Sequence, residues 1–357
     1  MKNADILTGI TTTGTPHLGN YVGAIRPAIE SSKEENKTSY YFLADYHAII
    51  KCQEPERIQK SALEVAATWI AMGLDTNKSI FYRQTDIPEI PELTWILTCV
   101  TAKGLMNRAH AYKAAVADNE ANIKIHTDKN ISTSDKDALN LDKERNDLDR
   151  DITMGLFCYP ILMAADILMF NANKVPVGKD QIQHIEMTRD IAGRFNKSYG
   201  EHFVLPEAVV DETSAVLSGL DGRKMSKSYN NTIPLFESDK ALRKLIMKIT
   251  TNSLAPEEPK DPKTCTLFAI YKAFATQEEV KAMERRYMEG IAWGTMKQEL
   301  FEYLNEILRE PRETYNRLIK SPGDLDAILK QGASKAREYS VPFIEKIRNA
   351  IGIKSIS

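Results

Sequence analysis

The sequence has few cysteines, no long apolar run and almost no net charge, and each scarcity excludes a class of protein. Its four cysteines (positions 52, 99, 158 and 265) are far apart without a C-x-x-C pair, which argues against a disulfide framework or a zinc site and predicts reduced thiols in a cytoplasm. The longest apolar stretch, residues 156–170, is interrupted by Pro160 and Asp166, so no membrane helix is expected, and the N-terminus lacks the apolar segment of a signal peptide. The 47 Lys and Arg nearly balance the 49 Asp and Glu, so any nucleic acid must be met by a local patch.

The chain does contain the alternation of short β-rich runs and helical patterns that is typical of a parallel sheet. Its 357 residues are 43% hydrophobic and 27% charged, as in globular proteins. Strands are expected at residues 5–9, 38–43, 79–82 and 175–177, and helices at 18–30 (bent near Pro27), 54–72 and 181–195. Strands separated by helices predict right-handed crossovers and a ligand site at the carboxyl ends of the strands.

The second half of the chain reads as helical. Helices are expected at residues 242–249, 267–275, 278–288, 295–308 and 312–320, followed by an amphipathic pair over 325–351. Residues 118–151 are dense in Asp, Asn and Lys, which predicts a solvated and mobile insertion. The expected layout is therefore an α/β domain over 1–237, interrupted by that insertion, a helical domain over 238–321, and C-terminal helices over 322–357 that pack back on the first domain.

The first stretch that indicates chemistry lies between the first strand and the first helix. It reads Thr11-Thr-Thr-Gly-Thr-Pro-His-Leu-Gly-Asn20. His17 opens the helix, whose unpaired N–H groups and partial positive charge suit a phosphate. Gly19 and Gly23 lack a Cβ and permit close approach of a nucleotide. The alternative is an ordinary strand–turn–helix in which His17 only caps the helix.

A second stretch, Asp221-Gly-Arg-Lys-Met-Ser-Lys-Ser228, is a cationic loop. Two lysines three residues apart, with hydroxyl groups between and after them, suit phosphate oxygens that move during a reaction. The alternative is an ordinary solvated loop.

Together these two stretches resemble the HIGH and KMSKS signatures of class I aminoacyl-tRNA synthetases. Four segments are similar to the bacterial tryptophanyl-tRNA synthetase family: Tyr159 to Leu168, Val175 to His184, Gly19-Asn-Tyr-Val-Gly23 and Leu43-Ala-Asp-Tyr-His-Ala48. The resemblance covers nearly the whole chain except the insertion. It implies a Rossmann-like catalytic domain, a helical anticodon-binding domain, a homodimer, and ATP with substrate-borne Mg²⁺ but no protein metal site.

Tryptophan fits one feature of the residues themselves. An indole presents a single N–H donor on an apolar body, and Asp166 is a carboxylate within an apolar helical run. Met163, one turn earlier, could pack on the ring. The resemblance aligns Asp166 with the indole-recognising Asp of the family and Met163 with its neighbouring Met; Tyr159 and Gln181 are further candidate contacts. The alternative is that Asp166 pairs with a lysine or caps a turn.

The resemblance also assigns the ATP contacts. They fall on Thr11, Thr12, Thr13, Gly19, Asn20, Gly178, Lys179, Asp180, Val216, Lys224, Met225, Ser226, Lys227 and Ser228. The three threonines stand where relatives often have Gln-Pro-Ser, and Lys179 replaces an acidic residue, which leaves only a backbone contact. Asn20 replaces the second His of the signature. Val216 is expected to pack on adenine or, equally, in the core.

The implied reaction is attack of the tryptophan carboxylate on the α-phosphate of ATP, with His17, Lys224 and Lys227 as the catalytic groups, followed by transfer to tRNA. Two basic clusters are candidates for the tRNA contact or are ordinary solvated faces: Arg243, Lys244 and Lys248, and Arg309, Arg312, Arg317 and Lys320. The apolar residues 93–100 could cover a partner subunit or belong to the core. Rival readings are a tyrosyl-tRNA synthetase, a small-molecule nucleotidyltransferase and a catalytically silent tRNA-binding paralogue.

Overall fold

A computed structural model describes residues 3–34, 37–127, 147–210, 216–354 and 356 of the chain. At its centre is a parallel sheet with the strand order β3-β2-β1-β4-β5. The strands are β1 (Ile6–Thr11), β2 (Ser39–Ala44), β3 (Ile80–Arg83), β4 (Lys174–Pro176) and β5 (Glu207–Val209). This is the predicted α/β fold, and the order reverses at β1, where such sheets bind ligands.

Helices cover both faces of the sheet, and β2 shows why. All six of its residues are buried, and successive side chains point to opposite faces. Tyr40 and Phe42 pack with α5 (Glu89–Val100), α9 (Met154–Met169) and α10 (Ile182–Tyr199), whereas Tyr41 packs with α2 (Arg26–Ser32) and α4 (Pro55–Ala71). A strand buried on both faces reads as a continuous apolar run, as residues 40–44 do.

The helix predicted over residues 18–30 forms in three parts and is not a single helix bent near Pro27. The chain forms α1 (Leu18–Asn20), a π-turn at Tyr21–Ile25, and then α2. The break therefore precedes Pro27, which lies in the first turn of α2. A proline is tolerated there because the N–H that it lacks has no partner in the first helical turn.

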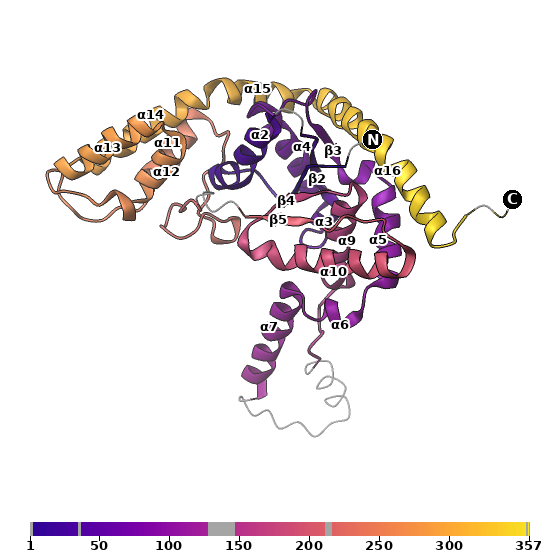
Figure 1. Cartoon of the computed structure of the whole chain (residues 1–357). Helices are drawn as coiled ribbons and strands as arrows, with labels where there is room; N and C mark the ends of the chain where they lie inside the picture. The colour runs from indigo at the N-terminus through magenta and orange to yellow at the C-terminus, as the bar shows by residue number, and fades with distance from the viewer. Residues whose placement is uncertain (1–2, 35–36, 128–146, 211–215, 355, 357) are drawn as a thin grey trace.

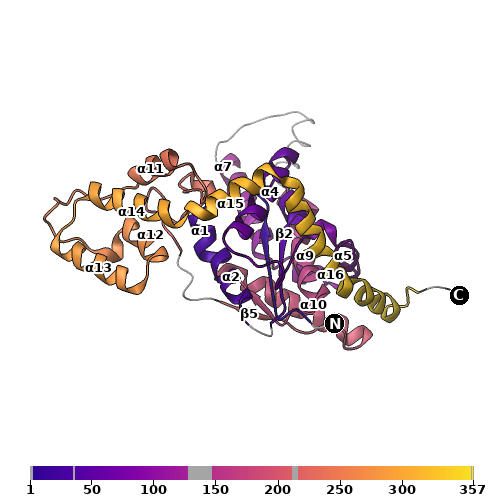
Figure 2. The ribbon, with the colours of Figure 1, turned by 90° about the horizontal axis from the view of Figure 1, so that it is seen from above.

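The second half is helical, as predicted. The helices are α11 (Asp239–Met247), α12 (Thr266–Phe274), α13 (Gln277–Glu289), α14 (Trp293–Ile307), α15 (Arg309–Lys320) and α16 (Pro322–Ala350). Helices α11–α14 gather at one end of the molecule, and α15 joins them to the sheet-containing body in both views (Figure 1, Figure 2). The predicted C-terminal pair was wrong: α16 is a single helix, because its buried residues form one continuous stripe from Leu325 to Ile347.

Several elements were not predicted, or only in part. Strand β5 is new, and residues 93–100 belong to α5, in which Leu93 and Leu97 are fully buried but Trp95 is exposed. The short helices are α3 (Asp45–Ile49) and α6 (Lys103–Met106), and single 3₁₀ turns lie at Gln84–Asp86, Lys179–Gln181, Lys227–Tyr229 and Pro262–Thr264. The expected insertion begins within α7 (His110–Thr127), which projects from the body, and residues 128–146 lie outside the described part (Figure 1). No helix in the described part is long and apolar enough to span a bilayer.

Helix α16 packs closely on the edge strand β3. A Cβ built on Gly332 would lie 1.8 Å from the backbone oxygen of Phe81. Gly332→Ala is therefore expected to lower the free energy of unfolding by about 3 kcal/mol or more, because strand and helix must separate. Urea denaturation measures this. Gly323→Ala, in the same helix with open space around it, is the matched control and should be neutral or stabilising; equal effects would contradict the prediction.

Candidate active site

The turn between β1 and α1 is held by α4. The Gly14 N–H donates to the Ser61 hydroxyl at 2.6 Å, and the Thr15 hydroxyl donates to the Glu64 carboxylate at 2.7 Å. Ser61 and Glu64 lie one turn apart on α4, so they fix two consecutive residues of the loop. This loop carries the chain from the carboxyl end of β1 to His17.

His17 caps α1. Its Nδ1 accepts the Asn20 N–H at 3.3 Å, while the Asn20 Oδ1 accepts the His17 N–H at 3.1 Å. Burial, with a smaller contribution from the positive charge of Lys227, lowers the pKa of His17 to about 4. The neutral ring therefore carries its proton on Nε2, because Nδ1 is already an acceptor. His17 therefore does cap the helix, as in the alternative interpretation, and its Nε2–H can still donate to an anion.

The depressed pKa of His17 makes stability depend on pH. Between the ordinary pKa of 6.5 and about 4, the unfolded chain binds a proton that the folded chain rejects, so stability falls as the pH drops through this window, by about 1 kcal/mol per pH unit. Guanidinium unfolding of the wild type and His17→Asn across this range measures the contribution. The variant should show the shallower decline, and parallel curves would contradict this assignment.

The lysine loop is anchored to the same helix. Met225 is buried with Leu18 of α1, and its N–H donates to the Leu217 carbonyl at 2.8 Å. The buried Asn231 accepts the Ser226 N–H at 2.8 Å and donates to the Lys224 carbonyl at 3.1 Å. The loop therefore has a fixed base, whereas the side chains of Lys224, Lys227 and Ser228 are exposed.

Lys227 lies against the turn of the first motif. A Cβ built on Gly14, which has φ +142°, would be 3.1 Å from its Nζ. Burial lowers the pKa of Lys227, and the nearby Glu64 partly opposes this shift. The structure thus brings the two predicted phosphate-binding segments together at one point.

A cleft of about 660 Å³ lies along the carboxyl ends of the strands; Thr11 and Thr13 of the turn line it, whereas His17 and Lys227 do not. Predicted residues that line it are Thr11, Thr13, Tyr159, Met163, Asp166, Gly178 and Gln181. Gly23 also lines it, and a Cβ there would meet nothing within 4 Å, which agrees with the open approach expected at this glycine.

Asp166 is the buried acceptor of the cleft. It is 1% exposed, and burial raises its pKa, whereas hydrogen bonds from two neighbours lower it. His47 Nε2 lies 2.9 Å from Oδ2, and Gln84 Nε2 donates to Oδ1 at 2.7 Å. Pairing of Asp166 with a lysine, the alternative considered above, was therefore wrong. An ionised carboxylate has about four lone-pair positions, so two remain for a ligand.

Tyr159 is held from behind by a buried histidine. Its hydroxyl hydrogen-bonds to His184 Nε2, and the two rings stack at 5.1 Å between centroids. Burial lowers the pKa of His184 and raises that of Tyr159. Both groups are therefore neutral at physiological pH, and the phenol is fixed at the wall of the cleft.

Not every predicted contact lines the cleft. Lys179 and Asp180 lie in the 3₁₀ turn beside it, where Asp180 Oδ2 accepts the Gln181 amide at 3.1 Å. Thr12 is fully buried, which turns its side chain away from a ligand in this arrangement. Val216 is 68% exposed, so its expected alternative as a core residue was wrong and only the adenine contact remains a prediction.

Two residues of the site were missed in the sequence. His47 and Gln84 each follow the carboxyl end of a strand, β2 and β3, which is where ligand-binding side chains gather. Their position directly after these strands was the sequence signal that could have identified them as site residues. Their contacts with Asp166 join residues 119 and 82 positions apart, a distance that no local pattern reveals.

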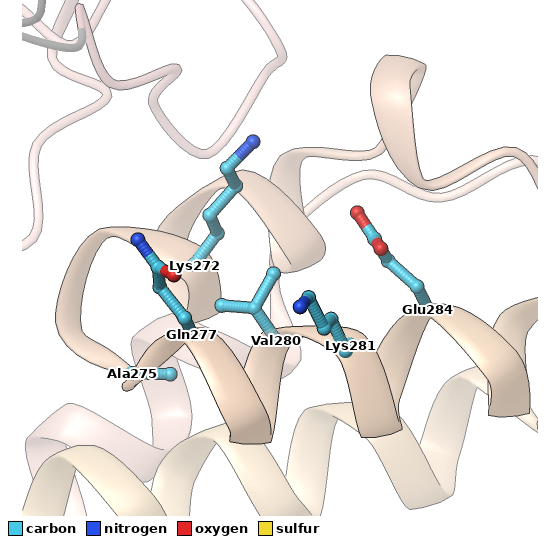
Figure 3. Close-up of a pocket in the computed structure, with 6 residues that line it drawn as sticks. All are labelled: Lys272, Ala275, Gln277, Val280, Lys281 and Glu284. Atoms are coloured by element: carbon cyan, nitrogen blue, oxygen red, sulfur yellow. The ribbon is translucent and has the colours of Figure 1, made fainter.

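A smaller hollow of about 330 Å³ lies on α12 and α13 (Figure 3). Its lining residues are Lys272, Ala275, Gln277, Val280, Lys281 and Glu284, and none of them is buried. It lacks the buried polar groups of the main cleft, which is therefore the candidate active site.

A doubly wound sheet with a phosphate-binding turn and a lysine loop at its switch point defines a nucleotide-binding α/β enzyme. Comparisons with known proteins identify which kind. The family model described as "tRNA synthetases class I (W and Y)" matches residues 1–309. The chain belongs to this family.

Three relatives of this chain are tryptophan–tRNA ligases, also called tryptophanyl-tRNA synthetases. The chain is 57% identical to the tryptophan–tRNA ligase of Pseudomonas aeruginosa over 98% of its length and 74% of that protein. It is 53% identical to the Neisseria meningitidis tryptophan–tRNA ligase over the whole of both. Among solved structures, tryptophanyl-tRNA synthetase from Campylobacter jejuni with ADP and tryptophan matches with a TM-score of 0.83 and 42% identity, over 97% of this chain and 99% of that one.

Proposed function

We propose that this chain is an ATP-dependent tryptophan–tRNA ligase. It activates L-tryptophan as tryptophanyl-adenylate, releases pyrophosphate, and transfers the amino acid to its tRNA. The observation that carries the proposal is the buried acceptor Asp166, in a cleft that is also lined by Thr11 and Thr13 of the turn against which Lys227 lies. A buried lone acceptor suits the indole N–H, because a ligand without that donor leaves the carboxylate unpaired.

The mechanism rests on position and charge. A carboxylate oxygen of tryptophan attacks the α-phosphorus in line, and the bond from that phosphorus to the bridging oxygen of pyrophosphate breaks. Lys224 and Lys227 stabilise the leaving pyrophosphate, and the Nε2–H of His17 donates to oxygens that gain charge. ATP arrives with Mg²⁺ on its phosphates, which neutralises part of their charge.

The remaining ligand contacts follow from the same placement. Met163 packs on the indole, and Tyr159 and Gln181 contact the amino-acid end. For ATP we propose further contacts from Thr11, Thr13, Gly19, Asn20, Gly178, Lys179, Asp180, Val216 and residues 224–228: Val216 packs on adenine, and Lys179 contributes only its backbone. Asp180 accepts from the ribose hydroxyls.

Amino-acid-dependent ATP–pyrophosphate exchange tests the function directly. Exchange that depends on tryptophan and not on tyrosine supports it, whereas the reverse would identify a tyrosyl enzyme. A phenol can both donate and accept, so its pocket needs no lone acceptor. Failure to form any adenylate on mixing with tryptophan and ATP would leave the silent paralogue as the explanation.

For tRNA, we propose the exposed basic face of α11. Arg243, Lys244 and Lys248 are all exposed there. The cluster on α15 is a weaker candidate, because Arg309 is paired with Glu306 and Arg312 with Asp239. The lysines of the hollow in Figure 3 offer additional phosphate contacts on the same group of helices.

Reversing the charge of Arg243, Lys244 and Lys248 together is expected to raise KM for tRNA by about 10-fold or more, because phosphate contacts depend on cations. Pyrophosphate exchange should be unchanged, since it needs no tRNA. Aminoacylation at several salt concentrations measures the effect, and the variant should be less sensitive to salt than the wild type. Reversal of Lys197, on α10, is the control.

We also propose that the protein is a cytoplasmic homodimer. The exposed Trp95 and Cys99 on the outer face of α5 provide an apolar surface that a second copy would cover. Sedimentation tests this: Trp95→Asp should give monomers, and a wild type that is monomeric at micromolar concentration would refute the dimer.

A further inference from the structure

Gln84 does not line the cleft, yet it contacts the acceptor that does. Its side chain is fully buried, and its Nε2 lies 2.7 Å from Asp166 Oδ1. It follows the last residue of β3 and begins a 3₁₀ turn, so its backbone is fixed by the sheet. Gln84 can therefore affect a ligand only through the residues that it contacts, of which Asp166 lines the cleft.

The orientation of the Gln84 amide is determined by its neighbours. The backbone N–H of Tyr46 donates to its Oε1 at 3.1 Å, and a backbone N–H cannot accept. The amide nitrogen must then face Asp166, where it needs an acceptor. An ionised carboxylate accepts only, whereas a protonated one can present a donor. The fixed amide consequently favours the ionised form of Asp166.

A second donor completes the arrangement. His47 Nε2 lies 2.9 Å from the other carboxylate oxygen, so each oxygen has one partner from a neighbouring strand end. In the described part of the chain, the titratable groups that act on Asp166 from other elements are His47 on α3 and Tyr82 on β3. Burial raises the pKa of Asp166 above its ordinary value, and the hydrogen bonds to His47 and Gln84 partly oppose this shift.

We propose that Gln84 is a positioning residue for amino-acid specificity: its amide holds Asp166 ionised and oriented as an acceptor for the indole N–H. This inference rests on the proposed function, because it assumes that Asp166 receives the indole. Loss of the Gln84 donor should weaken recognition of that N–H while the rest of the cleft stays intact.

The test compares tryptophan with its benzothiophene analogue, in which sulfur replaces the indole N–H. Both are assayed by kcat/KM in ATP–pyrophosphate exchange. The wild type should prefer tryptophan. Gln84→Met keeps the length but removes both the donor to Asp166 and the acceptor of the Tyr46 N–H, and it should reduce this preference about 10- to 100-fold. KM for ATP should not change.

Two variants separate positioning from a purely structural effect. Thr85→Val removes the hydrogen bond from the Thr85 hydroxyl to Asp45, between the same two segments, but does not touch Asp166, so it should retain the wild-type preference. Gln84→Glu should regain preference for tryptophan as the pH is lowered, since its protonated carboxyl can again donate to Asp166. Gln84→Met has no group that could donate to Asp166 at any pH, so its preference should not return as the pH is lowered.

The outcomes are distinct. Equal loss for both substrates in Gln84→Met, or no loss, overturns the role of Gln84 while leaving the tryptophan assignment standing. A wild type that treats both substrates alike overturns the indole contact at Asp166, and the inference with it.

Discussion

Asp166→Asn is expected to lower kcat/KM for tryptophan by about 100- to 1000-fold. In the wild type, the Asp166 carboxylate accepts hydrogen bonds from both His47 and Gln84. The amide of the variant has only one acceptor oxygen for those two donors and the indole N–H. At least one buried donor is left unpaired, and the charge that strengthens the indole bond is lost.

Pyrophosphate exchange at saturating ATP measures this effect. KM for ATP should stay near the wild-type value, because the carboxylate belongs to the amino-acid end of the cleft. Met163→Leu, which keeps the volume of a neighbouring lining residue, should cost far less. A comparable loss in both variants would mean that packing, and not the acceptor, selects the substrate.

Lys227→Ala is expected to slow adenylate formation by about 100- to 1000-fold while tryptophan binding stays nearly intact. The ammonium group lies at the Gly14 turn, where the leaving pyrophosphate would gain charge. Lys227→Arg should recover part of the rate, because arginine restores the positive charge but its planar guanidinium differs in shape from the lysine ammonium.

Stopped-flow measurement of adenylate formation, with tryptophan binding measured separately by fluorescence, distinguishes the two steps. Lys179→Ala is the matched control, since only its backbone is expected to contact the nucleotide. Unchanged exchange kinetics in Lys227→Ala would reject the catalytic role of this lysine.

The parts of the molecule that were predictable are those encoded locally. The continuous apolar run of β2 and the stripes of the later helices are short-range patterns, and the His17 and Lys227 segments are contiguous motifs. Strand β5 was missed because three residues, one of them charged, carry too little pattern. The bend at Tyr21–Ile25 was displaced from Pro27 because a proline in the first turn does not break a helix.

The inner part of the site depends on tertiary contact. Asp166 was found as a carboxylate in an apolar run, but its partners His47 and Gln84 come from two segments that follow strands β2 and β3, and only their position after a strand end marks them in the sequence. The single helix α16 was misread for a similar reason. Its continuity through Pro342 is maintained by packing along the sheet, which outweighs the local cost of a proline.

The close packing of Gly332 against the backbone of Phe81 has a consequence for folding during synthesis on the ribosome. Strand β3 is at the edge of the sheet, and the helix that covers it is encoded about 250 residues later. A nascent chain that has emerged only to the end of α15 still exposes that edge, which is the kind of surface that chaperones protect and that aggregation exploits. Helix α16 therefore covers the edge of a sheet whose strands are all synthesised before it.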